Sequence, residues 1–164
     1  MKIIITESQY NRILKEEEEQ KVLHIPSLKF FNDDWNLLQK FLESKGNPPY
    51  SIGGDLDLEK TPIKSLGNLT SVGGYLDLEK TPIESLGDLQ SVGGDLYARE
   101  TPIESLGDLQ SVGGDLNLRY TPIKSLGNLT SVGGDLILWD TPLSKKYTKK
   151  DIRQMVYVGG KLFM

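Results

Sequence analysis

The sequence predicts a solenoid, a fold in which similar turns stack on one another, and three observations lead to this prediction. The first is a phrase of 20 residues, SIGGDLDLEKTPIKSLGNLT, which recurs almost unchanged three times, while its first thirteen positions recur once more. A fixed period of about 20 residues is typical of solenoids, in which each unit contacts only its neighbours. The copies begin at Ser51, Ser71, Ser91, Ser111 and Ser131.

The second and third observations are the apolar pattern of one repeat and its recurrence in register. Leu56 and Leu58 alternate with polar residues, which is the period of a β-strand whose leucines point inward. The apolar residues at repeat positions two, six, eight, thirteen, sixteen and nineteen are kept in register from copy to copy. Stacked turns would therefore place leucine on leucine, with each strand parallel to the next.

The polar and glycine positions of the repeat predict its corners. Gly53, Gly54 and Gly67 are expected to provide positive φ angles, and Pro62 to stiffen the turn after the strand. The apolar residues of the second half of the repeat lie three apart, which predicts a return path of turns or short 3₁₀ segments.

Residues 1–50 are expected to form a helical N-terminal cap over the open end of the stack. The segment from Thr6 to Gln9 has the pattern of a capping box and predicts a helix from about Glu7 to Gln20, after a short apolar segment at residues 2–5. A second helix is predicted from Trp35 to about Lys45, with its N-cap within residues 32–34 and its end at Gly46. Residues 22–31 are expected to connect the two helices.

The repeat pattern stops after Pro142, and residues 144–164 are expected to close the stack. Thr148 is a candidate N-cap for a short helix, and the chain from Tyr157 to Met164 repeats the opening of the 20-residue phrase as a final strand. The predicted organisation is an α/β solenoid with a cap at residues 1–50, about five turns at residues 51–143, and a C-terminal helix and closing strand at residues 144–164.

Composition and charge exclude several classes of function. The chain has 164 residues, no cysteine and one histidine, His24, so it offers no thiolate metal site and no cysteine or serine–histidine nucleophile arrangement. It contains no apolar run long enough for a membrane span or signal peptide, which favours a cytoplasmic protein. Residues 51–143 carry 6 basic and 14 acidic residues, and this surplus of acid disfavours nucleic-acid binding. We therefore expect no enzyme activity, no cofactor and no membrane or nucleic-acid partner.

The repeat resembles two related families. The run from Leu56 to Ile63, LDLEKTPI, is similar to the strand and turn of leucine-rich repeats, and the wider phrase resembles the repeats of receptor L domains. The resemblance covers residues 51–143 and implies a short stack of parallel strands. Where leucine-rich repeats usually have asparagine, this chain has threonine, as at Thr61, and a ladder of threonine hydroxyl bonds is expected in its place. The opening residues 1–17 also resemble the starts of small proteins of tailed phages, which would imply action in the host cytoplasm.

Comparison of the copies with one another separates scaffold positions from variable positions. The apolar positions barely change, whereas positions five, seven, nine and ten differ between copies and would project together from the sheet. Exposed Trp, Tyr and Arg dominate protein interfaces, and the later copies carry several at these positions. The predicted partner-binding residues are Tyr75, Asp77, Glu79, Tyr97, Arg99, Asn117, Arg119, Tyr120, Ile137 and Trp139.

These observations favour non-catalytic recognition of a protein partner through the exposed strand face. Three alternatives stay open. The chain would instead be a structural component that assembles with copies of itself as a homo-oligomer, the variable positions would reflect drift on a solvated surface, or the acidic residues around Asp57 and Asp77 would hold a cation.

Overall fold

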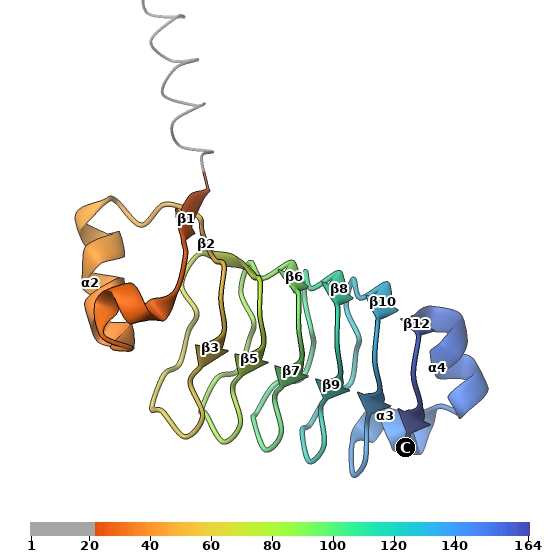
Figure 1. Ribbon diagram of the computed structural model, residues 1–164. Helices are drawn as coiled ribbons and strands as arrows, with labels where there is room; N and C mark the ends of the chain where they lie inside the picture. The colour runs from red at the N-terminus through yellow and green to blue at the C-terminus, as the bar shows by residue number, and fades with distance from the viewer. Residues whose placement is uncertain (1–21) are drawn as a thin grey trace, which may run out of the picture.

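The computed structural model describes residues 22–164, so the predicted helix at Glu7–Gln20 and the apolar segment at residues 2–5 lie outside the described residues. Within residues 22–164 the chain forms a solenoid of parallel strands with a spacing of about 20 residues, as the repeats predict (Figure 1). None of the helices described is long and apolar enough to cross a membrane.

Two parallel sheets run along the stack. One has seven strands, in the spatial order β1 (Leu23–Ile25), β2 (Tyr50–Ile52), β4 (Leu69–Val72), β6 (Ser91–Val92), β8 (Ser111–Val112), β10 (Ser131–Val132) and β12 (Tyr157–Val158). The other has six strands, in the order β3 (Leu56–Asp57), β5 (Leu76–Asp77), β7 (Leu96–Tyr97), β9 (Leu116–Asn117), β11 (Leu136–Ile137) and β13 (Leu162–Phe163). The architecture is thus a β-solenoid, and the helices expected of an α/β fold lie only at its two ends (Figure 1).

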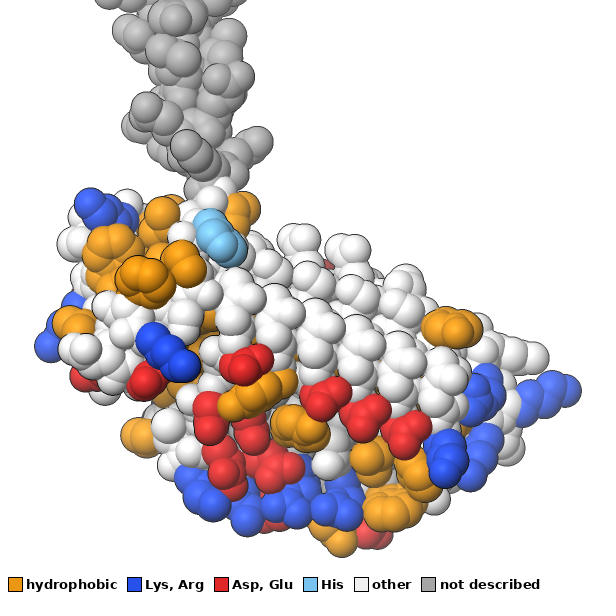
Figure 2. Space-filling model, in the orientation of Figure 1, with side chains coloured by type: hydrophobic (Ala, Val, Ile, Leu, Met, Phe, Trp, Pro, Cys, Tyr) orange, Lys and Arg blue, Asp and Glu red, His pale blue; other side chains and the backbone are white. Residues whose placement is uncertain are grey.

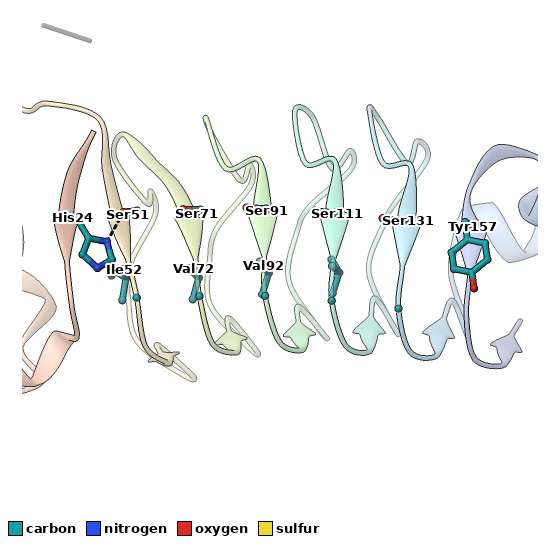
Figure 3. Close-up of a pocket in the computed structure, with 16 residues that line it drawn as sticks. His24, Ser51, Ile52, Ser71, Val72, Ser91, Val92, Ser111, Ser131 and Tyr157 are labelled. Atoms are coloured by element: carbon teal, nitrogen blue, oxygen red, sulfur yellow. Dashed lines mark hydrogen bonds between the residues drawn. The ribbon is translucent and has the colours of Figure 1, made fainter. Parts of the chain in front are cut away.

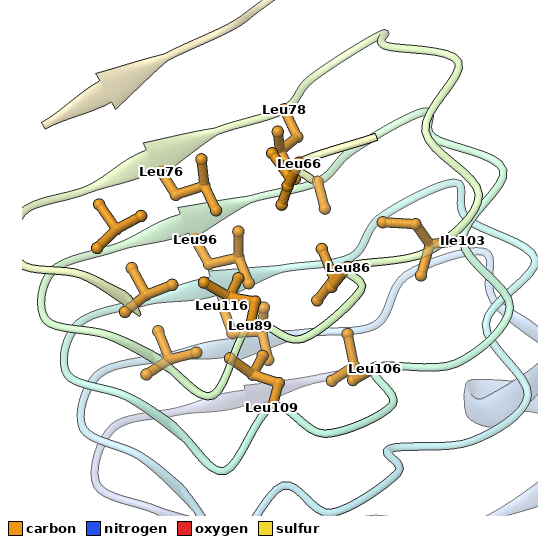
Figure 4. Close-up of a cluster of buried hydrophobic side chains, with 14 of the residues drawn as sticks. Leu66, Leu76, Leu78, Leu86, Leu89, Leu96, Ile103, Leu106, Leu109 and Leu116 are labelled. Carbon is orange, nitrogen blue, oxygen red and sulfur yellow. The ribbon is translucent and has the colours of Figure 1, made fainter. Parts of the chain in front are cut away.

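The strands pair in the register that the repeats predict. Leu76 is paired with Leu56 on one side and Leu96 on the other, and the same repeat position pairs at each later step of the six-stranded sheet. The inward leucines are buried and form one continuous hydrophobic cluster along the stack (Figure 4). Because neighbouring strands lie about 4.8 Å apart, each turn covers the apolar layer of the one before it.

The paired glycines at repeat positions three and four have a different role from the one expected. Neither Gly53 nor Gly54 has a positive φ angle, and the same holds for their later counterparts, whereas Gly67 has φ +59° as predicted. A Cβ atom built on Gly113 would overlap the carbonyl oxygen of Gly93 in the preceding turn. These glycines are required because consecutive backbones approach closely, not because the corner needs a left-handed residue.

The repeated threonine bonds to the backbone of its own turn. The hydroxyl of Thr81 donates to the carbonyl oxygen of Leu78 at 2.8 Å, and Thr61, Thr101, Thr121 and Thr141 make the same bond to the residue three positions earlier. The bonds close a turn within each repeat and recur at the same position in all five copies.

The N-terminal end contains one predicted helix and two further elements. Helix α2 (Trp35–Ser44) begins at Asp34, whose Oδ1 accepts from the backbone N–H of Asn36 at 2.8 Å. Residues 22–31, expected as a connector, instead contain β1, which extends the seven-stranded sheet, and a 3₁₀ helix, η1 (Leu28–Phe31). Buried side chains of α2 and η1 belong to the same hydrophobic cluster as the repeats.

The C-terminal end matches the prediction in its main features. Helix α4 (Lys149–Met155) has Thr148 as its N-cap, with Asp151 completing a capping box, and β12 and β13 continue the two sheets as the closing turn. A short helix, α3 (Pro142–Lys146), was not predicted. Ile152 and Val156 are buried in the core, whereas Met155 is exposed.

Candidate interaction surface

The six-stranded sheet has one side chain row facing the core and another facing outward. Positions six and eight point inward, and positions five, seven and nine are exposed or half-buried in every turn. Position ten lies in the turn that follows and has a positive φ angle in each copy, for example 60° at Tyr120. We call the outward side chains at these four positions the variable face.

The predicted partner-binding residues all lie on the variable face. Register pairing places position seven of each turn beside position seven of the next, so Asp57, Asp77, Tyr97, Asn117, Ile137 and Phe163 form one row. Figure 2 shows acidic side chains across this face, a row of Lys and Arg side chains along its lower rim, and further ones at its C-terminal end.

Position five has a structural role that explains its aspartates. Oδ1 of Asp95 accepts from the backbone N–H of Asp115 at 2.7 Å, and Oδ1 of Asp115 accepts in the same way from Asp135. The glycine at position four leaves the space in which this carboxylate sits. Tyr75 has no carboxylate and interrupts the ladder. Aspartate at this position therefore stabilises the stack, whereas Tyr75 is a departure that the scaffold does not require.

Position seven also has a local structural role where it is Asp or Asn. Oδ1 of Asp77 accepts from the backbone N–H of Glu79 at 2.9 Å, and Oδ1 of Asn117 accepts from that of Arg119 at 3.2 Å. Each bond spans two residues and stabilises the turn after the strand. Asp and Asn are interchangeable for this purpose, because both supply the accepting oxygen.

The acidic residues of the first turns are held close together. Burial raises the pKa of Asp77 above its ordinary value, and the charges of Glu79, Asp57 and Glu59 raise it further. Arg99 partly offsets this charge through its bridge to Glu79 at 3.0 Å. Among residues 22–164, no three His, Cys, Asp or Glu side chains are arranged to hold a metal ion. The acidic rows are therefore organised by backbone bonds and by Arg99.

Tyr97 is fixed by a neighbour on the same strand. Its hydroxyl donates to Oδ2 of Asp95 at 2.6 Å. This bond, together with partial burial, raises the pKa of Tyr97 to about 12. The ring is therefore held in one orientation on the variable face.

The last turns of the variable face carry a group of aromatic side chains around one arginine. The guanidinium of Arg119 lies 5.4 Å from the ring centre of Tyr120 and 5.8 Å from that of Trp139, and Trp139 meets Phe163 edge-on at 5.5 Å. Tyr120 is 52% exposed and Trp139 is 41% exposed. We call these four residues the aromatic cluster. Phe163 was not among the predicted partner-binding residues, although its place at position seven of the closing turn would have indicated it.

A second surface lies along the seven-stranded sheet. Serine, valine and glycine of successive turns line an open groove of about 560 Å³, with His24 at one end and Tyr157 at the other (Figure 3). Nδ1 of His24 lies 3.1 Å from the hydroxyl oxygen of Ser51. The lining is nearly the same in every turn, so this groove has little to distinguish one turn from the next. Sequence comparison of the copies did not indicate it, because the residues do not vary.

Comparison of the chain with models of known families, with curated proteins and with solved structures finds no match. The fold is nonetheless clear from the stacked parallel strands and their spacing of about 20 residues. This arrangement is compatible with a repeat of the leucine-rich type.

Proposed function

We propose that the chain is a non-catalytic recognition module that binds a protein partner through the variable face, with the aromatic cluster as the centre of contact. The observation that carries the proposal is the exposure of Trp139 and Tyr120 beside Arg119 on the outward face of the six-stranded sheet. Trp, Tyr and Arg are the residues on which binding energy in protein interfaces most often depends. The scaffold does not need them there, since other turns have charged residues at the same positions.

The state of Arg119 adds to this argument. Its Nε is buried and has no hydrogen-bond acceptor among the described residues. A buried donor without an acceptor costs free energy, and Arg99 of the preceding turn carries the same cost at its own Nε. The cluster combines apolar area with the positive charge of the half-buried Arg119, which suits a carboxylate on the partner.

The proposal also includes the family of the repeat and the organism that provides the partner. We assign the stack to the leucine-rich type on the resemblance of LDLEKTPI and its copies. The resemblance of residues 1–17 to phage proteins supports a partner in an infected bacterial host, and those residues lie outside the described part of the chain.

The test is a pull-down with tagged protein from an extract of the organism in which the chain occurs, read by mass spectrometry. The double variant Tyr120→Ala/Trp139→Ala should lose the captured partner, because truncation of two central aromatics typically weakens binding by about 2 kcal/mol or more. The matched control is Phe30→Ala/Tyr157→Ala, which removes two exposed aromatics that lie away from the variable face. Equal capture by both double variants would refute the proposal.

A mass measurement separates recognition from the structural alternative. A recognition module should remain monomeric at micromolar concentration, whereas a self-assembling component should form larger species. Self-association that the aromatic double variant abolishes would assign the variable face to contacts between copies instead.

A further inference from the structure

The six-stranded sheet has an edge at its N-terminal end that no described strand covers. Strand β3 pairs with β5 only, whereas the seven-stranded sheet is extended at the same end by β1. In the later turns the carbonyl oxygens of positions five and seven accept from the preceding turn, as Tyr75 and Asp77 accept from Leu56 and Leu58 at 2.9 Å. The corresponding carbonyls of Asp55 and Asp57 face the uncovered edge.

A groove runs along this edge. Two cavities of about 510 and 480 Å³ lie between the first turn and the N-terminal elements, and both are lined by Asp33 and Asp57. The first reaches Gly54, Asp55 and Tyr75, and the second continues past Leu58. The opposite wall is η1 and the start of α2, so the groove follows the direction of the strand. The groove therefore lies beside the backbone carbonyls that no described strand pairs.

The groove is acidic. It is lined by four acidic residues and two basic ones, Asp33, Asp34, Asp55, Asp57, Lys29 and Lys64. One oxygen each of Asp34, Asp55 and Asp57 accepts from a backbone N–H. None of these four carboxylates lies within 4 Å of a described Lys or Arg nitrogen. Asp55 and Asp57 are exposed, whereas their counterparts in the next four turns are half-buried between neighbours.

We propose that this groove binds an extended, basic segment of a partner protein, which adds to β3 as a further strand. An uncovered sheet edge is a template for strand addition, in which backbone bonds provide affinity and side chains provide selectivity. Asp55 and Asp57 point to the same face and lie two residues apart, about 6.6 Å along the strand. A segment with Lys or Arg at every second position matches that spacing. This surface is separate from the aromatic cluster, so the inference does not depend on the proposed function.

Two substitutions halve the number of acidic residues in the groove and keep the local backbone geometry. Asp33 has φ +56°, which Asn tolerates well, and the change Asp33→Asn keeps its shape. Asp57→Asn keeps the oxygen that accepts from Glu59 N–H at 3.0 Å, as Asn117 does in its own turn. The matched control is Asp77→Asn, the same change at the same repeat position inside the sheet.

The probe is a fluorescent seven-residue peptide of alternating valine and lysine, read by fluorescence anisotropy at low ionic strength. We expect saturable binding that Asp33→Asn/Asp57→Asn weakens about three- to tenfold and that Asp77→Asn leaves nearly unchanged. A peptide with glutamate in place of lysine should not bind, and one N-methylated along its pairing edge should bind much more weakly. Hydrogen exchange should show that the amide of Asp57 becomes protected when the peptide is bound, while that of Asp77 does not change.

Three results would overturn the proposal. The first is equal binding by the double variant and wild type, and the second is an Asp57 amide that exchanges at the same rate with and without saturating peptide. The third is protection of that amide before peptide is added, rising with protein concentration, which would assign the edge to a second copy of the chain. Because Tyr120→Ala/Trp139→Ala leaves this groove intact, it should bind the peptide normally, and failure here is distinguishable from failure of the proposed function.

Discussion

Arg153 donates from Nη1 to the carbonyl oxygen of Val158 at 3.0 Å, and its Nη2 donates to the carbonyl of Gly160 at 3.1 Å. In earlier turns the equivalent carbonyls accept from the paired glycines of the next turn, as Val132 and Gly134 do from the N–H groups of Gly159 and Gly160. Arg153 therefore takes the place of the backbone of a further turn. One side chain of α4 ends the seven-stranded sheet by satisfying its last acceptors.

Removal of this arginine should destabilise the closing turn. Arg153→Met keeps most of the apolar stem and deletes both donors, so we expect a loss of about 1–2 kcal/mol in the free energy of unfolding, reduced from the full value by partial exposure. Urea unfolding measures the loss. Lys150→Met, on the same helix, removes an exposed charge for which no bond to a described residue is found and should change stability by less than about 0.5 kcal/mol. Equal losses in the two variants would mean that helix charge, not edge capping, is responsible.

Substitution by alanine should lower the free energy of unfolding by different amounts at two glycines that occupy different repeat positions. At Gly113 the new Cβ atom would overlap the carbonyl oxygen of Gly93, which is backbone and has little freedom to move, so we expect a loss of about 3 kcal/mol or more. Gly107 has φ +56° and open space around it, and Gly107→Ala should cost only about 1 kcal/mol. Thermal and urea unfolding rank the two variants. The reverse order would show that the corner conformation matters more than the close approach of turns.

Neutralising Asp77 should stabilise the protein at neutral pH. Its pKa is raised in the folded state by burial and by neighbouring acidic groups, so the folded state binds this proton more tightly than the unfolded chain does. The ionised carboxylate therefore opposes folding at pH values above its folded pKa, and that opposition fades as pH falls through the folded pKa towards the unfolded one. Asp77→Asn keeps the turn bond to Glu79, and its advantage over wild type should be largest near pH 7 and disappear in acid.

The measurement is the difference in unfolding free energy between Asp77→Asn and wild type from pH 7 down to pH 3. A difference that stays constant over this range would contradict the assigned cause. The matched comparison is Asp88→Asn, the same change at an exposed aspartate of the return path, which should give a much flatter pH profile.

Much of the fold could be predicted because the same pattern of residues recurs in several repeats. Alternation at Leu56 and Leu58 predicts a strand, its recurrence every 20 residues predicts parallel stacking, and side-chain chemistry at Thr148 predicts the N-cap that α4 has. The prediction failed where the identity of a residue does not show which neighbouring residue it contacts. The paired glycines are an example, since they are required by contact with another turn.

The candidate surface could also be predicted only in part. Repeat comparison identified the variable positions, including Arg119 and Trp139, and left out Phe163. It could not show that aspartate at position five is bonded to the next turn, because a backbone donor has no sequence signature. Nor could it show the groove beside β3, which exists because η1 and α2, not a strand, occupy the end of that sheet.

By itself the sequence determined the length of the repeat, which side chains of each strand point inward or outward, and that equivalent repeat positions stack on one another. These features follow from local backbone geometry that is repeated without interruption. Only the tertiary structure decided where the sheets end and how each end is covered. That outcome depends on contacts between residues distant in the chain, such as β1 with β2, for which no repeated pattern exists. The open edge of β3 is a second example, because η1 and α2 lie at that end of the sheet in place of a strand.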